Sequence, residues 1–517
     1  MNHLVIAPLL LPLLAGILLL LLRSLALNWR RGLALAAVVG QVLLALTLIQ
    51  AVADGTILVY TVGNWPAPFG ICLVADRLAA WMLLTTAVLA LFALAYGCLG
   101  TDREGWHFHV LFQFELFGLN GAFLTGDLFN LFVFFEVLLI ASYGLLLHGG
   151  GRRRTIAGLH YVVINLAGSA LFLIAAGLFY GVLGTLNLAD LAVKVAATGP
   201  DHLPLVRIAG LLLCGVFALK AALVPLYLWL PAAYANTSAP VAALFAIMTK
   251  VGAYSILRVS TLVFGSGPTA GLVPGLTPGL IGDWLLPLAL LTLMVGMIGA
   301  AGSDRLRVQV AYLVLASVGT LLTAFGLGSA DGIAAGLWYL PHSAFAAAAL
   351  FLLADQIARQ RGDLTDRLDP GPVMGRHWVL GGLFFLGAIL IGGLPPLSGF
   401  IGKFLILRAA IDHPSALWVL SLVLIGGLLG LMTLARSGSL LFYRATDQWR
   451  PGLDHVRRTT PPAWAALGMI SGLLALGVAM TLWAGPLSDY TQAMARQLLE
   501  PGAYVQAVLR PDGRGKP

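Results

Sequence analysis

The feature of this sequence that most restricts its fold is a series of apolar runs, each long enough to cross a lipid bilayer. A membrane-spanning helix needs about 20 apolar residues, and hydrophobic residues make up 59% of the 517 in the chain. Charged residues make up only 10%, whereas a soluble protein carries about 25%. The sequence therefore predicts an all-α membrane protein and excludes a soluble enzyme. Fourteen such runs lie at residues 3–22, 32–52, 76–99, 106–125, 128–148, 155–183, 205–229, 239–264, 283–302, 306–327, 332–356, 378–411, 416–443 and 462–485.

The arginines fall mainly in alternate loops between these runs. Arg23, Arg30 and Arg31 follow the first run, and the cluster Arg152 to Arg154 follows the fifth. Loops on the cytoplasmic side of a membrane carry an excess of Lys and Arg, so this alternation predicts that both termini lie outside. The positive residues neither form a basic block nor alternate with aromatic side chains, so the net charge of +8 does not predict nucleic-acid binding.

Motifs for cofactor-dependent or hydrolytic chemistry are missing from the sequence. The three cysteines, Cys72, Cys98 and Cys214, have no metal-binding spacing. No Walker A sequence, glycine-rich nucleotide loop or His-Glu-x-x-His pattern occurs. We therefore expect no cofactor and no resident metal, and we expect neither ATP-driven transport nor hydrolysis.

Two apolar runs are interrupted by proline, and each also contains a lysine. The first interruption spans Leu219 to Pro231, with Lys220, and the second spans Gly392 to Lys403. Backbone that is opened at membrane depth must be buried in protein or line water, and broken helices at corresponding positions of two repeats indicate a transport path. Each interruption lies in the fourth span of a five-span block, at 106–264 and at 283–443. Because five is an odd number, the two blocks are predicted to be inverted relative to each other.

The remaining segments flank these two blocks. Residues 1–105 hold the first three spans and a short extracellular hairpin at 56–73, which Gly and Pro residues bound. Residues 462–485 form the last span, and residues 486–517 form a polar tail that is too short for another domain.

Several lysines, unlike the arginines, fall inside the predicted spans. Of the five lysines in the chain, Lys220, Lys250 and Lys403 lie within apolar runs. Arginine stays protonated in any protein environment, but an amine removed from water can release its proton near neutral pH. A charge at mid-membrane costs about 3 kcal/mol, so these lysines are expected to face a hydrated interior. They are candidate proton carriers.

One carboxylate and one histidine complete the candidate set. Glu136 lies near the middle of its span, and its expected partner is the buried cation Lys220, since a change in their separation would alter the proton affinity of the amine. His342 follows Pro341, which is expected to open the helix, and a neutral imidazole can pass protons between lysines. Two further ionisable residues in predicted spans have roles that the sequence leaves open: Glu115 and His160.

Four motifs are the most specific parts of the sequence for assigning a family. They are Asp127-Leu-Phe-Asn-Leu-Phe-Val-Phe-Phe-Glu136, the segment Lys220 to Pro231, the stretch Ser238 to Tyr254, and Leu394-Pro-Pro-Leu-Ser-Gly-Phe-Ile-Gly-Lys403. With these motifs the chain resembles, over nearly all of its membrane part, the antiporter-like subunits shared by Mrp-type Na+/H+ antiporters and respiratory complex I. Two further segments look most like the D-type subunits of the Mrp antiporters: Gly184 to Leu191 and Ala311 to Gly319.

The resemblance implies a fold of fourteen helices with two inverted five-helix repeats. It implies a Glu136/Lys220 pair in the first repeat and Lys403 at the matching site of the second, with Lys250 and His342 between them. It further implies that the chain works in a bacterial plasma membrane, together with other membrane subunits of a hetero-oligomeric complex.

The resulting hypothesis is a proton-translocating subunit of a monovalent cation/proton antiporter, with Na+ as the expected cation. One alternative is a proton-pumping membrane subunit of complex I or of a membrane-bound hydrogenase, which would use the same lysines. A second alternative is a passive scaffold whose buried charges serve assembly. A third is a self-contained carrier of organic solutes, although the sequence shows no convergent polar pocket for one.

Overall fold

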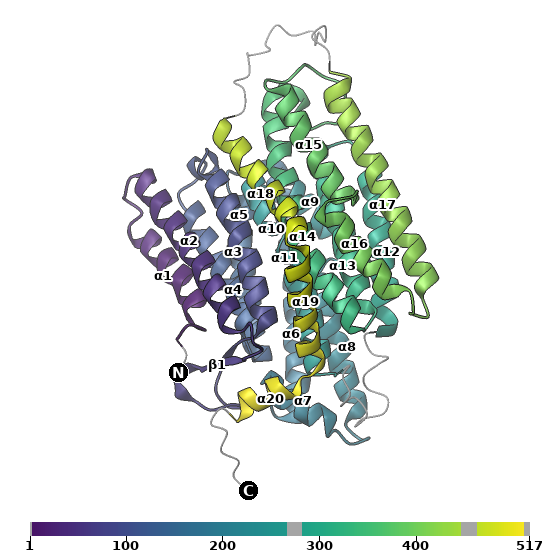
Figure 1. The fold of residues 1–517 in the computed structure, drawn as a ribbon. Coiled ribbons are helices and arrows are strands. Elements are labelled where there is room, and N and C mark those ends of the chain that lie inside the picture. The colour runs from purple at the N-terminus through teal and green to yellow at the C-terminus, as the bar shows by residue number, and fades with distance from the viewer. Residues whose placement is uncertain (1–2, 266–281, 446–462, 511–517) are drawn as a thin grey trace.

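The chain folds into a bundle of helices (Figure 1). The computed structural model describes residues 3–265, 282–445 and 463–510. The helices are α1 (Ala7–Leu21), α2 (Leu27–Ala51), α3 (Arg77–Gly97), α4 (Phe108–Leu124), α5 (Leu128–Leu147), α6 (Arg152–Leu183), α7 (Leu188–Ala196), α8 (Leu203–Lys220), α9 (Trp229–Asn236), α10 (Ala239–Phe245), α11 (Met248–Leu262), α12 (Gly282–Ala301), α13 (Leu306–Gly326), α14 (Ala330–Gln360), α15 (His377–Gly392), α16 (Ser398–Ala410), α17 (Ala416–Gly438), α18 (Trp464–Leu482), α19 (Ala484–Leu499) and α20 (Gly502–Leu509). The strands are β1 (Leu58–Thr61) and β2 (Cys72–Ala75), and the short helical turns are η1 (Val62–Asn64), η2 (Thr101–Arg103), η4 (Gly362–Leu364) and η5 (Ser439–Tyr443).

The apolar runs account for this architecture, because each predicted run contains helix. Within the described residues, eleven spans are long and apolar enough to cross a membrane, and three shorter apolar helices are α1, α4 and α15. Two of the eleven spans, Ala239–Leu262 and Ala330–Gln360, are buried along their whole apolar segment. They lie near the middle of the bundle, where α10, α11 and α14 meet (Figure 1). The chain is therefore an all-helical, multi-pass membrane protein.

Both predicted helix interruptions are present. The helix α8 ends at Lys220 and α9 begins at Trp229, while α15 ends at Gly392 and α16 begins at Ser398. Pro225, Pro395 and Pro396 lie between the helix halves, and the missing backbone N–H of each favours a break there. The two lysines occupy different halves of their interrupted helices. Lys220 is the last residue of the first half, whereas Lys403 lies within the second half.

The expectation that Pro341 opens its helix is wrong. The helix α14 continues through Pro341 from Ala330 to Gln360. A single missing N–H is tolerated in a membrane helix when neighbouring helices surround it, and α14 is buried on all sides.

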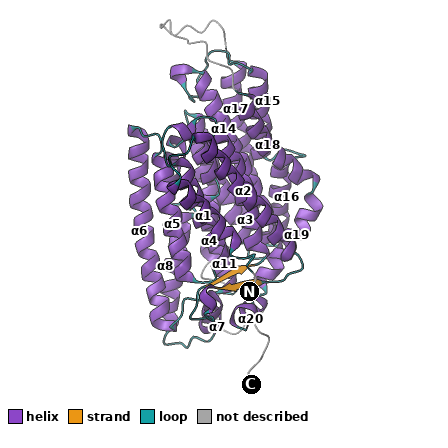
Figure 2. Cartoon of the chain, turned by 90° about the vertical axis from the view of Figure 1, so that its left-hand side faces the viewer, coloured by secondary structure: helices purple, strands orange, loops and turns teal. Residues whose placement is uncertain are grey.

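One end of the bundle carries the small sheet. The strands β1 and β2 pair antiparallel, which confirms the hairpin predicted near residues 56–73. They lie at the same end as α7 and α20, where α1 also begins (Figures 1 and 2). The predicted polar tail contains two helices that the sequence analysis missed. The helix α19 packs against α14 and buries Thr491, Met494, Ala495 and Leu498.

Arginines join the helices at the other end of the bundle. The Arg154 guanidinium donates to the carbonyl of Asn236, and that of Arg307 donates to the carbonyl of Thr237 and pairs with Asp355. At the same end, a bidentate ion pair links Arg31 of α2 to Asp102 of η2, with N–O distances of 2.5 and 2.8 Å. Burial opposes ionisation of Asp102, but the hydrogen bonds from Arg31 and His109 more than offset it and hold the pKa of that carboxyl well below its usual range.

Candidate functional site

Lys220 ends α8 inside the bundle. Its side chain is buried, and its Nζ donates to Oδ1 of Asn165 on α6 over 3.1 Å and lies 5.9 Å from the ring centroid of Phe135. A cavity beside Nζ, lined also by Tyr161, offers about 20 Å³ to the centre of a water molecule, which is room for one water. The amine thus has one neutral acceptor, an aromatic face and space for one solvent molecule.

Glu136 and Lys220 are both present in this region, but they do not touch. Oε1 of Glu136 accepts a hydrogen bond from Ser169 of α6, and no ion pair joins the carboxylate to the amine of Lys220. The two charges still interact electrostatically. Each member of the predicted pair therefore bonds a different neutral side chain on α6, Asn165 for Lys220 and Ser169 for Glu136.

Lys250 lies close to Lys220 because α11 packs directly on the end of α8. A Cβ on Gly252 would clash with the backbone nitrogen of Ala221, so this contact requires glycine. The side chain of Lys250 is fully buried, and its Nζ donates to Oγ of Ser317 on α13 over 3.2 Å. Lys250, like Lys220, therefore has a neutral hydrogen-bond partner, which here is a hydroxyl.

His342 and Lys403 lie beyond Lys250 along the bundle. Nδ1 of His342 is 2.8 Å from Oγ of Ser398, the first residue of α16, and the imidazole interacts electrostatically with both Lys250 and Lys403. Nζ of Lys403 donates to the carbonyls of Ile391 and Gly392 over 3.0 and 2.9 Å. These carbonyls belong to the open end of α15, where an uninterrupted helix would bond them internally.

The structure therefore places the five predicted residues on neighbouring helices of one bundle, and each of them bonds its own neutral group. Sequence reasoning missed those neutral groups because each is a single polar residue in an apolar helix. A signal was present on α6, where Tyr161, Asn165 and Ser169 recur every four residues and so share one helix face.

Two other predicted ionisable residues stand apart from these five. His160 is exposed on α6, so it does not belong with them. Glu115 is fully buried on α4, and neither of its oxygens has a hydrogen-bond partner in the described part of the chain.

One group of possible metal ligands occurs in the described residues. It lies at the end of the bundle opposite the β1/β2 hairpin, where Arg31, Arg154 and Arg307 also lie, which we call the Arg-rich end. Ligand atoms of Cys98, Asp102 and His109 lie within 4.8 Å of one another. Arg31 already bonds both carboxylate oxygens of Asp102. Its fixed positive charge opposes a cation there, so the donor set does not fit a metal ion.

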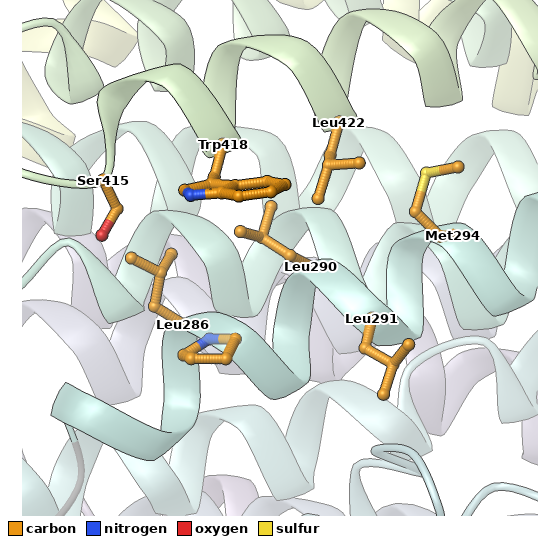
Figure 3. A pocket seen from close by; sticks show the side chains of 8 residues that line it. Leu286, Leu290, Leu291, Met294, Ser415, Trp418 and Leu422 are labelled. Carbon is orange, nitrogen blue, oxygen red and sulfur yellow. The ribbon is translucent and has the colours of Figure 1, made fainter.

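A separate cavity between α12 and α17 contains none of the predicted residues. It offers about 460 Å³ to water centres. Figure 3 shows its lining, in which Ser415 is the only hydroxyl among apolar side chains. A cation needs several oxygen ligands, so this cavity does not suit ion transport. Its full lining is Leu286, Pro287, Leu290, Leu291, Met294, Ser415, Trp418 and Leu422.

Comparison with known proteins places this chain in a family. Residues 125–430 match the family model described as "NADH:quinone oxidoreductase/Mrp antiporter, TM". The chain belongs to this family. It is 41% identical to the D-type subunit of a probable K+/H+ antiporter of Rhizobium meliloti (strain 1021), over 98% of each chain. It is 37% identical to the D-type subunit of the Na+/H+ antiporter of Alkalihalophilus pseudofirmus, over 99% of this chain and all of the relative.

A solved structure extends the comparison to three dimensions. A chain in the structure of the Mrp complex from Dietzia sp. DQ12-45-1b superposes with a TM-score of 0.85 at 26% identity, covering 98% of this chain and all of that one. The fold is thus shared with a component of a multisubunit membrane complex, and the two full-length relatives are named as antiporter subunits rather than enzymes. Glu136, Lys220, Lys250, His342 and Lys403 all fall within the family match, whereas Glu115 precedes it.

Proposed function

We propose that this chain is the proton-translocating subunit of a multisubunit monovalent cation/proton antiporter. One observation carries the proposal: Lys220 and Lys250, which are buried, Lys403, which is half-buried, and the buried His342 lie inside a helical bundle, and each bonds a neutral oxygen. Amines in such surroundings can exchange protons, and ionisable groups within a membrane protein interior mark ion pathways. Protons would pass between Lys220, Lys250, His342 and Lys403.

Glu136 would control the first step of this transfer. Its carboxylate is half-buried and interacts with Lys220 only through space. Movement of Glu136 toward the amine favours the ammonium form, and movement away favours release of its proton. Among the described residues, the side chain of Glu136 is hydrogen-bonded by Ser169, and it can make such a movement without breaking a direct ion pair.

The finer architecture of the proposal is fourteen spans with two inverted five-helix repeats. The eleven candidate spans and three shorter apolar helices support the number. The two interrupted helices, at 219–231 and 392–403, support repeats at 106–264 and 283–443. Arginines gather at the end of the bundle opposite the β1/β2 hairpin, which supports termini outside a bacterial plasma membrane.

The proposed partners are other membrane subunits, the lipid bilayer, protons and a monovalent cation. The Mrp complex of Dietzia supports partner subunits. The relatives differ in the cation of their names, K+ in one and Na+ in the other. We propose Na+ as the exchanged cation, with K+ as the alternative.

Everted membrane vesicles that contain the whole complex test this function. Addition of Na+ or K+ should release a preformed proton gradient, as read by a pH-sensitive dye, in the wild type. Glu136→Gln and Lys220→Ala should abolish the response while the complex still assembles. Lys194→Ala is the matched control, since Lys194 lies on α7 and pairs with Asp190 near the surface. Retention of full exchange in both variants would refute the proposal, and co-purification of flavin and Fe–S subunits would favour an oxidoreductase complex.

A further inference from the structure

The carboxyl of Glu115 is a buried ionisable group that the proposed function does not use. It lies on α4 with no exposed surface, and both oxygens are without a hydrogen-bond partner among the described residues. An ionised carboxylate without partners is very costly in an apolar environment. The group therefore needs either its own proton or a donor that reaches it at some stage of the transport cycle.

Two buried tyrosines interact with this carboxyl through space. They are Tyr161 on α6 and Tyr234 on α9. The hydroxyl of Tyr234 is engaged with the carbonyl of Phe245 over 2.6 Å. The hydroxyl of Tyr161 lies 3.0 Å from Oγ of Ser142, and either oxygen can be the donor. Tyr161 is thus the neighbour whose hydroxyl can reorient and pass on a proton.

Tyr161 also borders the cavity of Lys220. The cavity that holds room for one water is lined by Tyr161, Asn165 and Lys220. Along the same face of α6, Asn165 bonds Lys220 and Ser169 bonds Glu136. One face of α6 therefore bonds Lys220 and Glu136 directly, and it also carries Tyr161, which interacts electrostatically with Glu115.

The positions of Glu115 and Glu136 along their helices differ. Glu115 lies seven residues from the start of α4, about 10 Å from the Arg-rich end at a rise of about 1.5 Å per residue. Glu136 lies eight residues from the start of α5, which is at the opposite end of the bundle. Glu115 therefore lies nearer the Arg-rich end of its helix, and Glu136 lies nearer the hairpin end of its own.

We infer that Glu115 is a proton-carrying residue that supplies Lys220 from the Arg-rich end of the bundle, through the hydroxyl of Tyr161. This inference rests on the proposed function. In the step, the carboxylic acid of Glu115 gives its proton to the Tyr161 hydroxyl oxygen, which passes its own proton to the water in the cavity and from there to the amine. The products are a Glu115 carboxylate and a Lys220 ammonium, and the tyrosine and the water are unchanged. A proton from the Arg-rich side then restores Glu115.

The test uses the complete complex in everted vesicles. Glu115→Gln has the same shape. Because neither oxygen of Glu115 is hydrogen-bonded within the described part of the chain, a purely structural role predicts no loss. We expect instead at least a hundredfold lower cation-driven proton exchange, within the range of about 10²- to 10⁴-fold for a lost proton-transfer group. Glu115→Asp should regain a large part of the rate. Tyr161→Phe, which keeps the ring, should slow exchange by at least about tenfold.

Two controls separate the possible failures. Gln113→Met removes another fully buried polar group of α4 and should leave the rate within about twofold, since the side-chain volume is nearly kept and no proton carrier is lost. If Glu115→Gln and Tyr161→Phe both exchange at the wild-type rate while Lys220→Ala is inactive, the inference is overturned and the proposed function stands. If Lys220→Ala is also active, the proposed function itself fails. Should Glu115→Gln not assemble, the rate of Tyr161→Phe decides alone.

Discussion

Loss of the Asp76 carboxylate should destabilise the hairpin end of the bundle strongly. Asp76 bonds both Nη atoms of Arg258 on α11, at 2.5 and 2.7 Å, and both side chains are buried. The same carboxylate caps α3 by accepting from the backbone nitrogen of Ala79 over 2.9 Å. The rings of Tyr254 and Tyr504 lie 5.5 Å from the Arg258 guanidinium and exclude water from it.

The magnitude follows from these two roles. Removing one partner of a buried ion pair costs about 3–5 kcal/mol, because the other charge stays buried and unpaired. Removing a helix cap costs about 1 kcal/mol. Asp76→Ala loses both and should cost about 4–6 kcal/mol, while Asp76→Asn keeps a capping oxygen and should cost about 3–5 kcal/mol. Replacing both charges, with Asp76→Asn and Arg258→Met together, should recover at least about 2 kcal/mol relative to the sum of the single changes.

Unfolding of the purified chain in mild detergent by increasing SDS, followed by circular dichroism, measures these free energies. Asp201→Asn is the control, because Asp201 is exposed beyond α7 and forms no ion pair in the described part of the chain; it should change stability by less than about 0.5 kcal/mol. An Asp76→Asn variant within about 1 kcal/mol of the wild type would refute the reasoning. So would a double variant whose loss equals the sum of the two single losses.

Two further predictions concern other packed contacts. Asp102→Asn should lower stability at neutral pH by about 2 kcal/mol, because it removes a charged partner of Arg31. The depressed pKa of Asp102 means that its contribution is present above the unfolded pKa of about 3.9 and is lost as pH falls toward the folded value, so thermal denaturation should show the variant and the wild type converging only below about pH 4. Gly399→Ala would drive a Cβ into the carbonyl oxygen of Leu390, so it should disrupt α16 packing and abolish exchange. Gly382→Ala, where no atom lies within 4 Å, should assemble and exchange normally in the same vesicle assay.

The sequence predicted well those residues that have a large free-energy cost inside a membrane. A lysine in an apolar run and a proline that interrupts a helix are both unfavourable in lipid, so Lys220, Lys403 and the two interruptions were visible from residue type alone. Pro341 was misjudged because the sequence does not reveal how completely neighbours surround α14. Its missing hydrogen bond is tolerated there.

The features that the sequence did not predict depend on contacts between distant segments. Nothing in the motif around Glu136 shows that Ser169, 33 residues later, donates a hydrogen bond to it. The helix α19 escaped notice because only one of its faces is apolar, and its docking against α14 became apparent only in the fold. A single neutral residue such as Ser317 carries no compositional signal, although its hydroxyl determines which hydrogen bonds a buried amine can form.

The partners of the buried cations explain why lysine and arginine are used at different places in the bundle. Arg258 keeps a permanent charge, and a carboxylate neutralises it at close range. Lys220, Lys250 and Lys403 have no carboxylate within ion-pair distance in the described part of the chain, and bond an amide oxygen, a hydroxyl and two carbonyls instead. Such neutral acceptors take a hydrogen bond from an ammonium and from a neutral amine alike. The contacts that hold each lysine can therefore persist when its proton leaves, whereas a direct carboxylate partner would favour a single charge state.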